Sequence, residues 1–188
     1  MIGYIDDTMA TIENRDLGEQ VAKKLWPYSL VHGDYHGSNM MIKEDGSGNT
    51  KTPLEAVVLD FQLVQISEPV ADLGKMLLIC LSPEDRRKCE KRLVRKNYDA
   101  LVAAGMDSKT MPFDLYFLRY AFQGAMSWML ICGVMDTLMA DGKDDEYLVA
   151  MIYERLAAFC EDHGNPAEIG AKTVEWRERL LKEAAAWK

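Results

Sequence analysis

The feature that most constrains the fold of this chain is the helix-forming sequence that begins at Pro69 and continues to the C-terminus. Ser82 and Pro83 supply an N-cap and a proline at the first helical position, and glycine or proline marks each later boundary. The sequence therefore predicts a mainly α protein. The predicted helices span residues 69–81, 83–105, 112–142, 145–163 and 166–188.

Two short runs ahead of these helices predict a small β-hairpin, which makes the fold class α+β. Residues 39–43 (NMMIK) and 55–61 (EAVVLDF) have the composition of strands, and the segment DGSGNTKT between them suits a surface turn. A two-stranded hairpin does not stabilise itself, so we expect it to lie on the helices. The opening segment to residue 26 has Leu17, Val21 and Leu25 at helical spacing and predicts one more helix.

Length and composition predict one domain over residues 1–188, with a loop-and-hairpin part at 28–62 and a helical part at 69–188. The net charge of -8 argues against nucleic-acid binding, which needs clustered Lys and Arg. The apolar run 120–135 is shorter than the ~20 residues that cross a bilayer, so we expect a buried helix and no membrane association. The basic run 86–96 contains Glu90 and predicts a solvated helix face.

The cysteines and the first residues predict a cytoplasmic protein. Cys80, Cys89, Cys132 and Cys160 lie far apart in the sequence and lack the spacing of a metal site, so we interpret them as reduced thiols. The opening MIGYIDD places two aspartates where a secretory signal needs an apolar run.

The polar loop before the hairpin contains the residues that point to chemistry. His32, Asp34 and Asn39 have the spacing H-x-D-x-x-x-x-N, and the apolar run VVL leads to Asp60. A carboxylate on a loop can accept the proton of a hydroxyl group. An amide oxygen at the start of one strand and a carboxylate at the end of its partner are two hard ligands for Mg²⁺. This pattern matches the catalytic loop and the metal-binding strand end of kinases.

Three segments carry a resemblance to a superfamily of small-molecule kinases. HGDYHGSN (residues 32–39) resembles the HGDLHPGN-type loop of aminoglycoside phosphotransferases, and VVLDFQ (57–62) resembles the strand end of the ecdysteroid-kinase-like (CHK) branch. PVADLGKML (69–77) resembles the P-x-x-D-L segment that follows in the same superfamily. The chain thus resembles the C-terminal lobe of aminoglycoside phosphotransferase/choline kinase-like proteins, which have a protein-kinase-like fold.

The resemblance implies an ATP-dependent phosphotransferase that moves the γ-phosphate to a hydroxyl group of a small molecule. It implies that Asp34 is the catalytic base, and that Asn39 and Asp60 bind Mg²⁺ and with it the phosphates of ATP. Only eight residues separate Asp60 from Pro69, which leaves no room for the activation segment of a protein kinase. The acceptor is therefore expected to be a small hydroxylated molecule, and its identity stays open.

The resemblance also implies supporting roles around the base. His32 would anchor the loop, His36 would pack against or orient Asp34, and Asp72 would be a buried acceptor that steadies the loop backbone. The sequence departs from the superfamily at Gly37-Ser38, where Pro-Gly is commoner. This change makes the loop less stiff and keeps its length.

The nucleotide-binding lobe of this superfamily has no counterpart in the sequence. Neither G-x-G-x-x-G nor G-x-x-x-x-G-K-[ST] occurs, and only 31 residues precede the loop. We therefore expect that the chain begins inside the second lobe, that the N-terminal lobe or a partner chain is missing, and that the chain alone binds nucleotide weakly.

Two other functions stay open from the sequence. A non-catalytic binding module is the first, because a kinase lobe without its partner lobe can lose activity. A metal-dependent phosphoesterase is the second, because residues 33–37 match G-D-x-H-G. The dinuclear site of such an enzyme needs further ligands, and the only histidine beyond the loop is His163.

Overall fold

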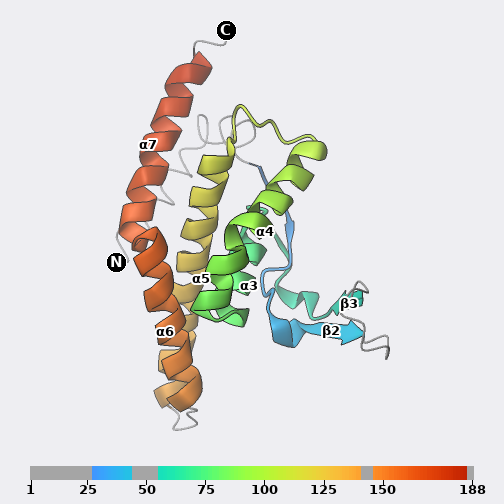
Figure 1. Cartoon of the computed structure of the whole chain (residues 1–188), viewed down its shortest axis with the longest axis vertical. Helices are drawn as coiled ribbons and strands as arrows, with labels where there is room; N and C mark the ends of the chain where they lie inside the picture. The colour runs from blue at the N-terminus through green and yellow to red at the C-terminus, as the bar shows by residue number, and fades with distance from the viewer. Residues whose placement is uncertain (1–26, 44–54, 141–145, 186–188) are drawn as a thin grey trace.

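The computed structural model describes residues 27–43, 55–140 and 146–185, and within them the predicted α+β class is confirmed. Most of this part is helical, with small antiparallel sheets at one side (Figure 1). The predicted opening helix and the predicted turn between the hairpin strands lie outside the described residues. The helices are α3 (Ala71–Cys80), α4 (Pro83–Ala103), α5 (Phe113–Ala140), α6 (Glu146–His163) and α7 (Pro166–Ala185).

The helix boundaries agree with the predicted ones to within a few residues because local signals set them. Ser82 is the N-cap of α4, and its Oγ accepts a hydrogen bond of 3.1 Å from the backbone amide of Asp85. Gly105 and Gly164 follow the ends of α4 and α6 with φ of 109° and 96°, the left-handed conformation that ends a helix.

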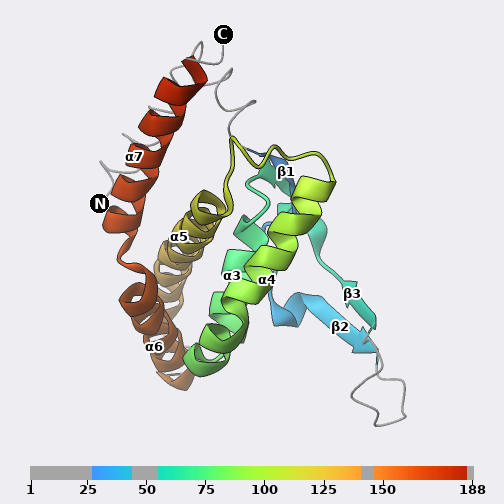
Figure 2. The same cartoon turned by 45° about the horizontal axis from the view of Figure 1, so that its top comes forward.

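Helix α5 lies in the middle of the helical body, between α3 and α4 on one side and α6 and α7 on the other (Figures 1 and 2). A glycine pair permits the close approach of α3 and α5, since a Cβ on Gly74 would lie 2.9 Å from the backbone nitrogen of Gly124. No helix in the described ranges is long and apolar enough to cross a membrane. The buried side chains at the centre of this core include Leu78, Val94, Tyr116, Tyr120, Phe159 and Ile169.

The prediction that the basic run 86–96 forms a solvated face of α4 is wrong for Arg86. This residue is buried, with 2% of its surface exposed. Its guanidinium donates to Glu90 at 2.6 Å and to Asp162 at 2.5 Å. Tyr120 donates to Glu90 at 2.9 Å, and His163 Nε2 lies 3.2 Å from the same carboxylate. A buried arginine is tolerated here because carboxylates from two helices surround it.

Four short strands form two separate two-stranded antiparallel sheets. The predicted hairpin is present as β2 (Met40–Lys43) and β3 (Glu55–Val58), with Met40 opposite Val58. The sequence did not predict the second sheet, in which β1 (Ser29–Val31) pairs with β4 (Gln65–Ser67). Strands of three residues carry too few side chains to show a period-2 pattern.

The hairpin differs from its prediction in two respects. It projects from the helical body instead of lying on it (Figure 2), and Met41 and Val57 are 62% and 55% exposed. Strand β3 also ends at Val58, short of the predicted residue 61, because Asp60 adopts φ 62° and ψ 66° and a 3-10 turn follows at Phe61–Leu63. A left-handed residue cannot continue a strand.

Candidate active site

His32 ties the loop to the end of the hairpin. Its Nε2 donates to the carbonyl of Leu59 at 2.7 Å, and its Nδ1 accepts from the backbone amide of Asp34 at 3.2 Å. These partners assign the neutral tautomer with the proton on Nε2. The ring of Phe61 packs on the imidazole with centroids 4.8 Å apart. Both nitrogens of His32 are therefore used in holding the backbone.

Asp72, in the first turn of α3, holds the loop from the other side. Its Oδ2 accepts from the backbone amide of His32 at 2.7 Å, and its Oδ1 accepts from that of Gly33 at 2.9 Å. Two charge-assisted hydrogen bonds to one carboxylate fix the orientation of both backbone amides. The structure thus places Asp72 at the loop backbone, where the sequence analysis expected it to act.

Gly33 is the residue at which the loop turns toward the site. Its φ is 80°, and a Cβ at this position would lie 2.2 Å from the carbonyl oxygen of Leu63. Both the backbone conformation and the space therefore require glycine. The loop backbone at Gly33 therefore passes close to Leu63, in the 3-10 turn that follows Asp60.

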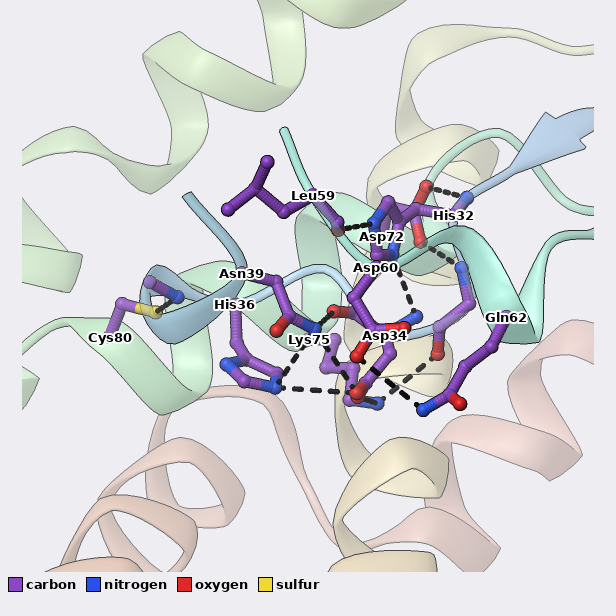
Figure 3. A network of polar contacts seen from close by, with 12 residues as sticks. His32, Asp34, His36, Asn39, Leu59, Asp60, Gln62, Asp72, Lys75 and Cys80 are labelled. Atoms are coloured by element: carbon purple, nitrogen blue, oxygen red, sulfur yellow. Dashed lines mark hydrogen bonds and ion pairs between the residues drawn. The ribbon is translucent and has the colours of Figure 1, made fainter. Parts of the chain in front are cut away.

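Asp34 lies at the centre of a network of side chains (Figure 3). Its Oδ1 accepts from Lys75 Nζ at 2.6 Å, and its Oδ2 lies 3.3 Å from His36 Nε2. Asn39 Nδ2 donates to the backbone carbonyl of Asp34 at 3.0 Å and to Oδ2 at 3.2 Å. The structure therefore brings His36, Asn39 and Asp34 together. The loop spacing pointed to Asp34 and Asn39, and the resemblance implied the place of His36.

The environment of Asp34 favours its ionised form. Partial burial raises the pKa of this carboxyl, but the hydrogen bond and charge of Lys75, together with His36, outweigh it and hold the pKa below the ordinary 3.8. Asp34 is therefore an anion at neutral pH and can accept a proton.

Asp60 enters the same region from the end of β3. The backbone amide of Leu59 donates to the carbonyl of Asn39 at 2.9 Å, so Asn39, just before β2, lies beside Leu59, the residue that precedes Asp60. In Figure 3 the Asp60 side chain points toward Asp34 and Asn39. Gln62 Nε2 donates to Asp60 Oδ2 at 3.4 Å, the only hydrogen bond to this carboxylate within the described residues.

The oxygens of Asn39 and Asp60 fit the ligand preference of Mg²⁺. Because Nδ2 of Asn39 faces Asp34, its Oδ1 is turned away from that carboxylate and is left as an acceptor. Phosphate oxygens and waters would complete the octahedral shell of Mg²⁺. Over residues 27–43, 55–140 and 146–185, no group of three or more His, Cys, Asp or Glu side chains is arranged to hold a metal ion.

The sequence analysis missed two residues that contact the loop. Lys75 Nζ donates to Asp34 Oδ1 and, at 3.1 Å, to the carbonyl of Gly33. Cys80 Sγ accepts from the backbone amide of Gly37 at 3.1 Å. The position of Lys75 three residues after Asp72, on the same face of α3, is a signal that could have found it. The Cys80 contact had no signal in the sequence.

The fold and the site define an α+β protein with a carboxylate-and-amide site at the junction of a loop, a hairpin and a helix. The chain belongs to the DUF1679 family, described as "Uncharacterized oxidoreductase dhs-27", whose model matches residues 4–164. That description names a class of enzyme. No curated protein and no solved structure matches the chain.

Proposed function

We propose that this chain is the C-terminal lobe of a small-molecule kinase, and that Asp34 is its catalytic base. The observation that carries this proposal is the position of the Asn39 side chain. Its amide nitrogen holds Asp34, its Oδ1 has no hydrogen-bond partner among the described residues, and the Asp60 side chain points toward the same place (Figure 3). A base and two candidate oxygen ligands for Mg²⁺ thus lie in one region, which is the combination that phosphoryl transfer needs.

The proposed reaction assigns one task to each residue. The proton of the acceptor hydroxyl moves to Asp34 Oδ2, and the oxygen forms a bond to the γ-phosphorus. The bond between that phosphorus and ADP breaks, and its electron pair leaves with ADP. Mg²⁺, when bound through Asn39 and Asp60, supplies positive charge to the phosphate oxygens. His32 and Asp72 keep the loop in place through their backbone contacts.

Exposed apolar side chains on the strands support the further proposal that a second lobe or a partner chain covers this side. Leu30 and Ile66 are opposite each other in the β1–β4 sheet and are 70% and 67% exposed. Met41, Ile42 and Val57 on the hairpin are also more than half exposed. Exposed apolar side chains that gather on neighbouring strands are typical of an interaction site. In a kinase of this type, the covering lobe would hold the nucleotide.

The family description supports a second candidate function, an oxidoreductase. A nicotinamide-dependent oxidoreductase would bind a dinucleotide. The 188 residues do not contain the G-x-G-x-x-G pattern, which both the common dinucleotide-binding fold and the glycine-rich loop of kinases use, so this pattern does not separate the two candidates. The arrangement of Asp34, Asn39 and Asp60 favours the kinase over this alternative.

Calorimetric titrations of the chain with ATP plus Mg²⁺, and separately with NADH, distinguish the two functions. The kinase proposal expects weak binding, because the covering lobe would hold most of the nucleotide. This binding should require Mg²⁺ and be lost in Asp60→Ala, because the variant removes one of two oxygen ligands. Asp99→Asn, an exposed change on α4, is the matched control and should bind as the wild type does. NADH binding together with an unchanged ATP titration in Asp60→Ala would contradict the proposal.

A further inference from the structure

Lys75 makes the shortest contact to the side chain of the proposed base. The 2.6 Å bond from its Nζ to Asp34 Oδ1 is a charge-assisted hydrogen bond, whereas the contacts of Oδ2 with Asn39 and His36 are 3.2 and 3.3 Å long. The two oxygens of Asp34 are therefore unequal. One is held tightly by a cation, and the other has weaker neighbours that an acceptor hydroxyl could replace.

The surroundings of Lys75 show that this contact is built into the fold. Its side chain is only 12% exposed, so the ammonium has given up most of its water and depends on the oxygens of Asp34 and Gly33. Lys75 also follows the first turn of α3, where the helix dipole gives a cation no advantage. Stability of the helix therefore does not explain a lysine at this position.

Lys75 and Asp72 divide the contacts of α3 with the loop between them. Asp72 binds the amide of Gly33, and Lys75 binds its carbonyl. Only Lys75 reaches beyond the backbone to the side chain of Asp34. The two residues thus have separable tasks, since the backbone amides are held by the carboxylate and the Asp34 rotamer by the ammonium.

We propose that Lys75 is a positioning residue for Asp34: its ammonium takes Oδ1, fixes the side-chain rotamer and leaves Oδ2 as the oxygen that receives the acceptor proton. The role of Oδ2 rests on the proposed function, whereas the fixing of the rotamer does not. The groups around Asp34 are Lys75 and Asp72 from α3, His32, His36 and Asn39 from the loop, and Asp60 from the end of β3.

The proposal is tested by NMR on the chain without nucleotide, so its outcome is independent of the ATP titration. The couplings between Hα and the two Hβ protons of Asp34 report its rotamer. Wild type should show the pair of couplings that belongs to a single rotamer. Lys75→Met should move both toward the average over several rotamers, because the remaining contacts of the carboxylate are long. Lys75→Arg keeps the cation and should restore the wild-type pair.

Two controls separate positioning of Asp34 from general support of the loop. Lys43→Met removes the exposed ion pair of Lys43 with Glu55 and should leave the Asp34 couplings unchanged. In Lys75→Met, the amides of His32 and Gly33 should stay protected from hydrogen exchange, since Asp72 still holds them. An unchanged Asp34 rotamer in Lys75→Met would overturn the proposal. So would loss of protection at both amides, because Lys75 would then support the loop as a whole.

Discussion

The loop around Asp34 and the interior between α4, α5 and α6 each contain a cation, carboxylates and a histidine, but the two networks are built differently. In the interior, Arg86 is surrounded by Glu90 and Asp162, and Tyr120 and His163 complete the set. Each of these five side chains has a partner on another helix. Burial makes this pairing obligatory, because an unpaired charge inside a protein is costly.

At the loop, the same kinds of side chain leave acceptors available. Asn39 Oδ1 has no hydrogen-bond partner among the described residues, and Asp60 receives one long hydrogen bond from Gln62. The backbone of this loop, in contrast, is held firmly by His32 and Asp72. A cluster of charged side chains is thus a candidate binding site when its backbone is held in place and some of its side-chain oxygens have no hydrogen-bond donor.

Among variants of the loop around Asp34, Asp34→Asn should have the largest effect on the rate of phosphoryl transfer. Loss of a general base lowers kcat by about 10²–10⁴-fold. This corresponds to about 3–5 kcal/mol on the activation barrier. Phosphoryl transfer is to be measured in a two-lobed protein with an identified acceptor. Urea unfolding is to be measured beside it, because Lys75 loses its charged partner in this variant. A variant that keeps its rate would remove Asp34 from the role of base.

Arg86→Met should give the largest loss of stability. Removing the cation leaves Glu90 as an uncompensated buried charge, which typically costs about 3–5 kcal/mol in the free energy of unfolding. Arg87→Met is the matched control, because Arg87 contacts the same Asp162 from an exposed position and should change the urea midpoint very little. If both variants lose the same unfolding free energy, burial of Arg86 does not make its ion pairs more important for stability than the exposed pair of Arg87.

Gly33→Ala tests how firmly the loop backbone is fixed. The left-handed conformation and the contact with Leu63 predict a loss of about 1–3 kcal/mol, together with faster hydrogen exchange at the His32 amide. Gly105→Ala carries a similar conformational cost, but its Cβ would meet nothing within 4 Å. It should therefore be the milder variant. If the two variants lose the same free energy, the clash of the new Cβ with the Leu63 carbonyl oxygen does not contribute to the loss.

The smallest expected effect is a pH dependence of the unfolding free energy that arises at Glu90, in the interior network around Arg86. Burial raises the pKa of Glu90, but His163 and Arg86 outweigh it and hold the pKa below 4.5. The folded state therefore binds a proton at Glu90 less readily than the unfolded state does. Its stabilising contribution is complete above pH 4.5 and is lost as the pH falls through the folded pKa. The unfolding free energy of Glu90→Gln, measured by urea at several pH values, should depend less steeply on pH in this window.

Most of the helical architecture could be predicted from the sequence. Ser82, Gly105 and Gly164 act within one turn of the residues they control, so their effect does not depend on the rest of the fold. The grouping of Asp34 with Asn39 was also accessible, because five residues of loop keep them close. The end of β3 was missed because the conformation of Asp60 depends on the loop that packs beside it.

The sequence by itself determined where helices begin and end and which polar residues share the loop, because both follow from interactions between near neighbours. Only the tertiary structure decided that Lys75 reaches Asp34, that Arg86 is buried and that the hairpin projects from the helices. Lys75 and Asp34 are 41 residues apart, and Arg86 and Asp162 are 76 apart. Contacts over such separations depend on how each helix is rotated and packed, which the pattern of one segment does not specify.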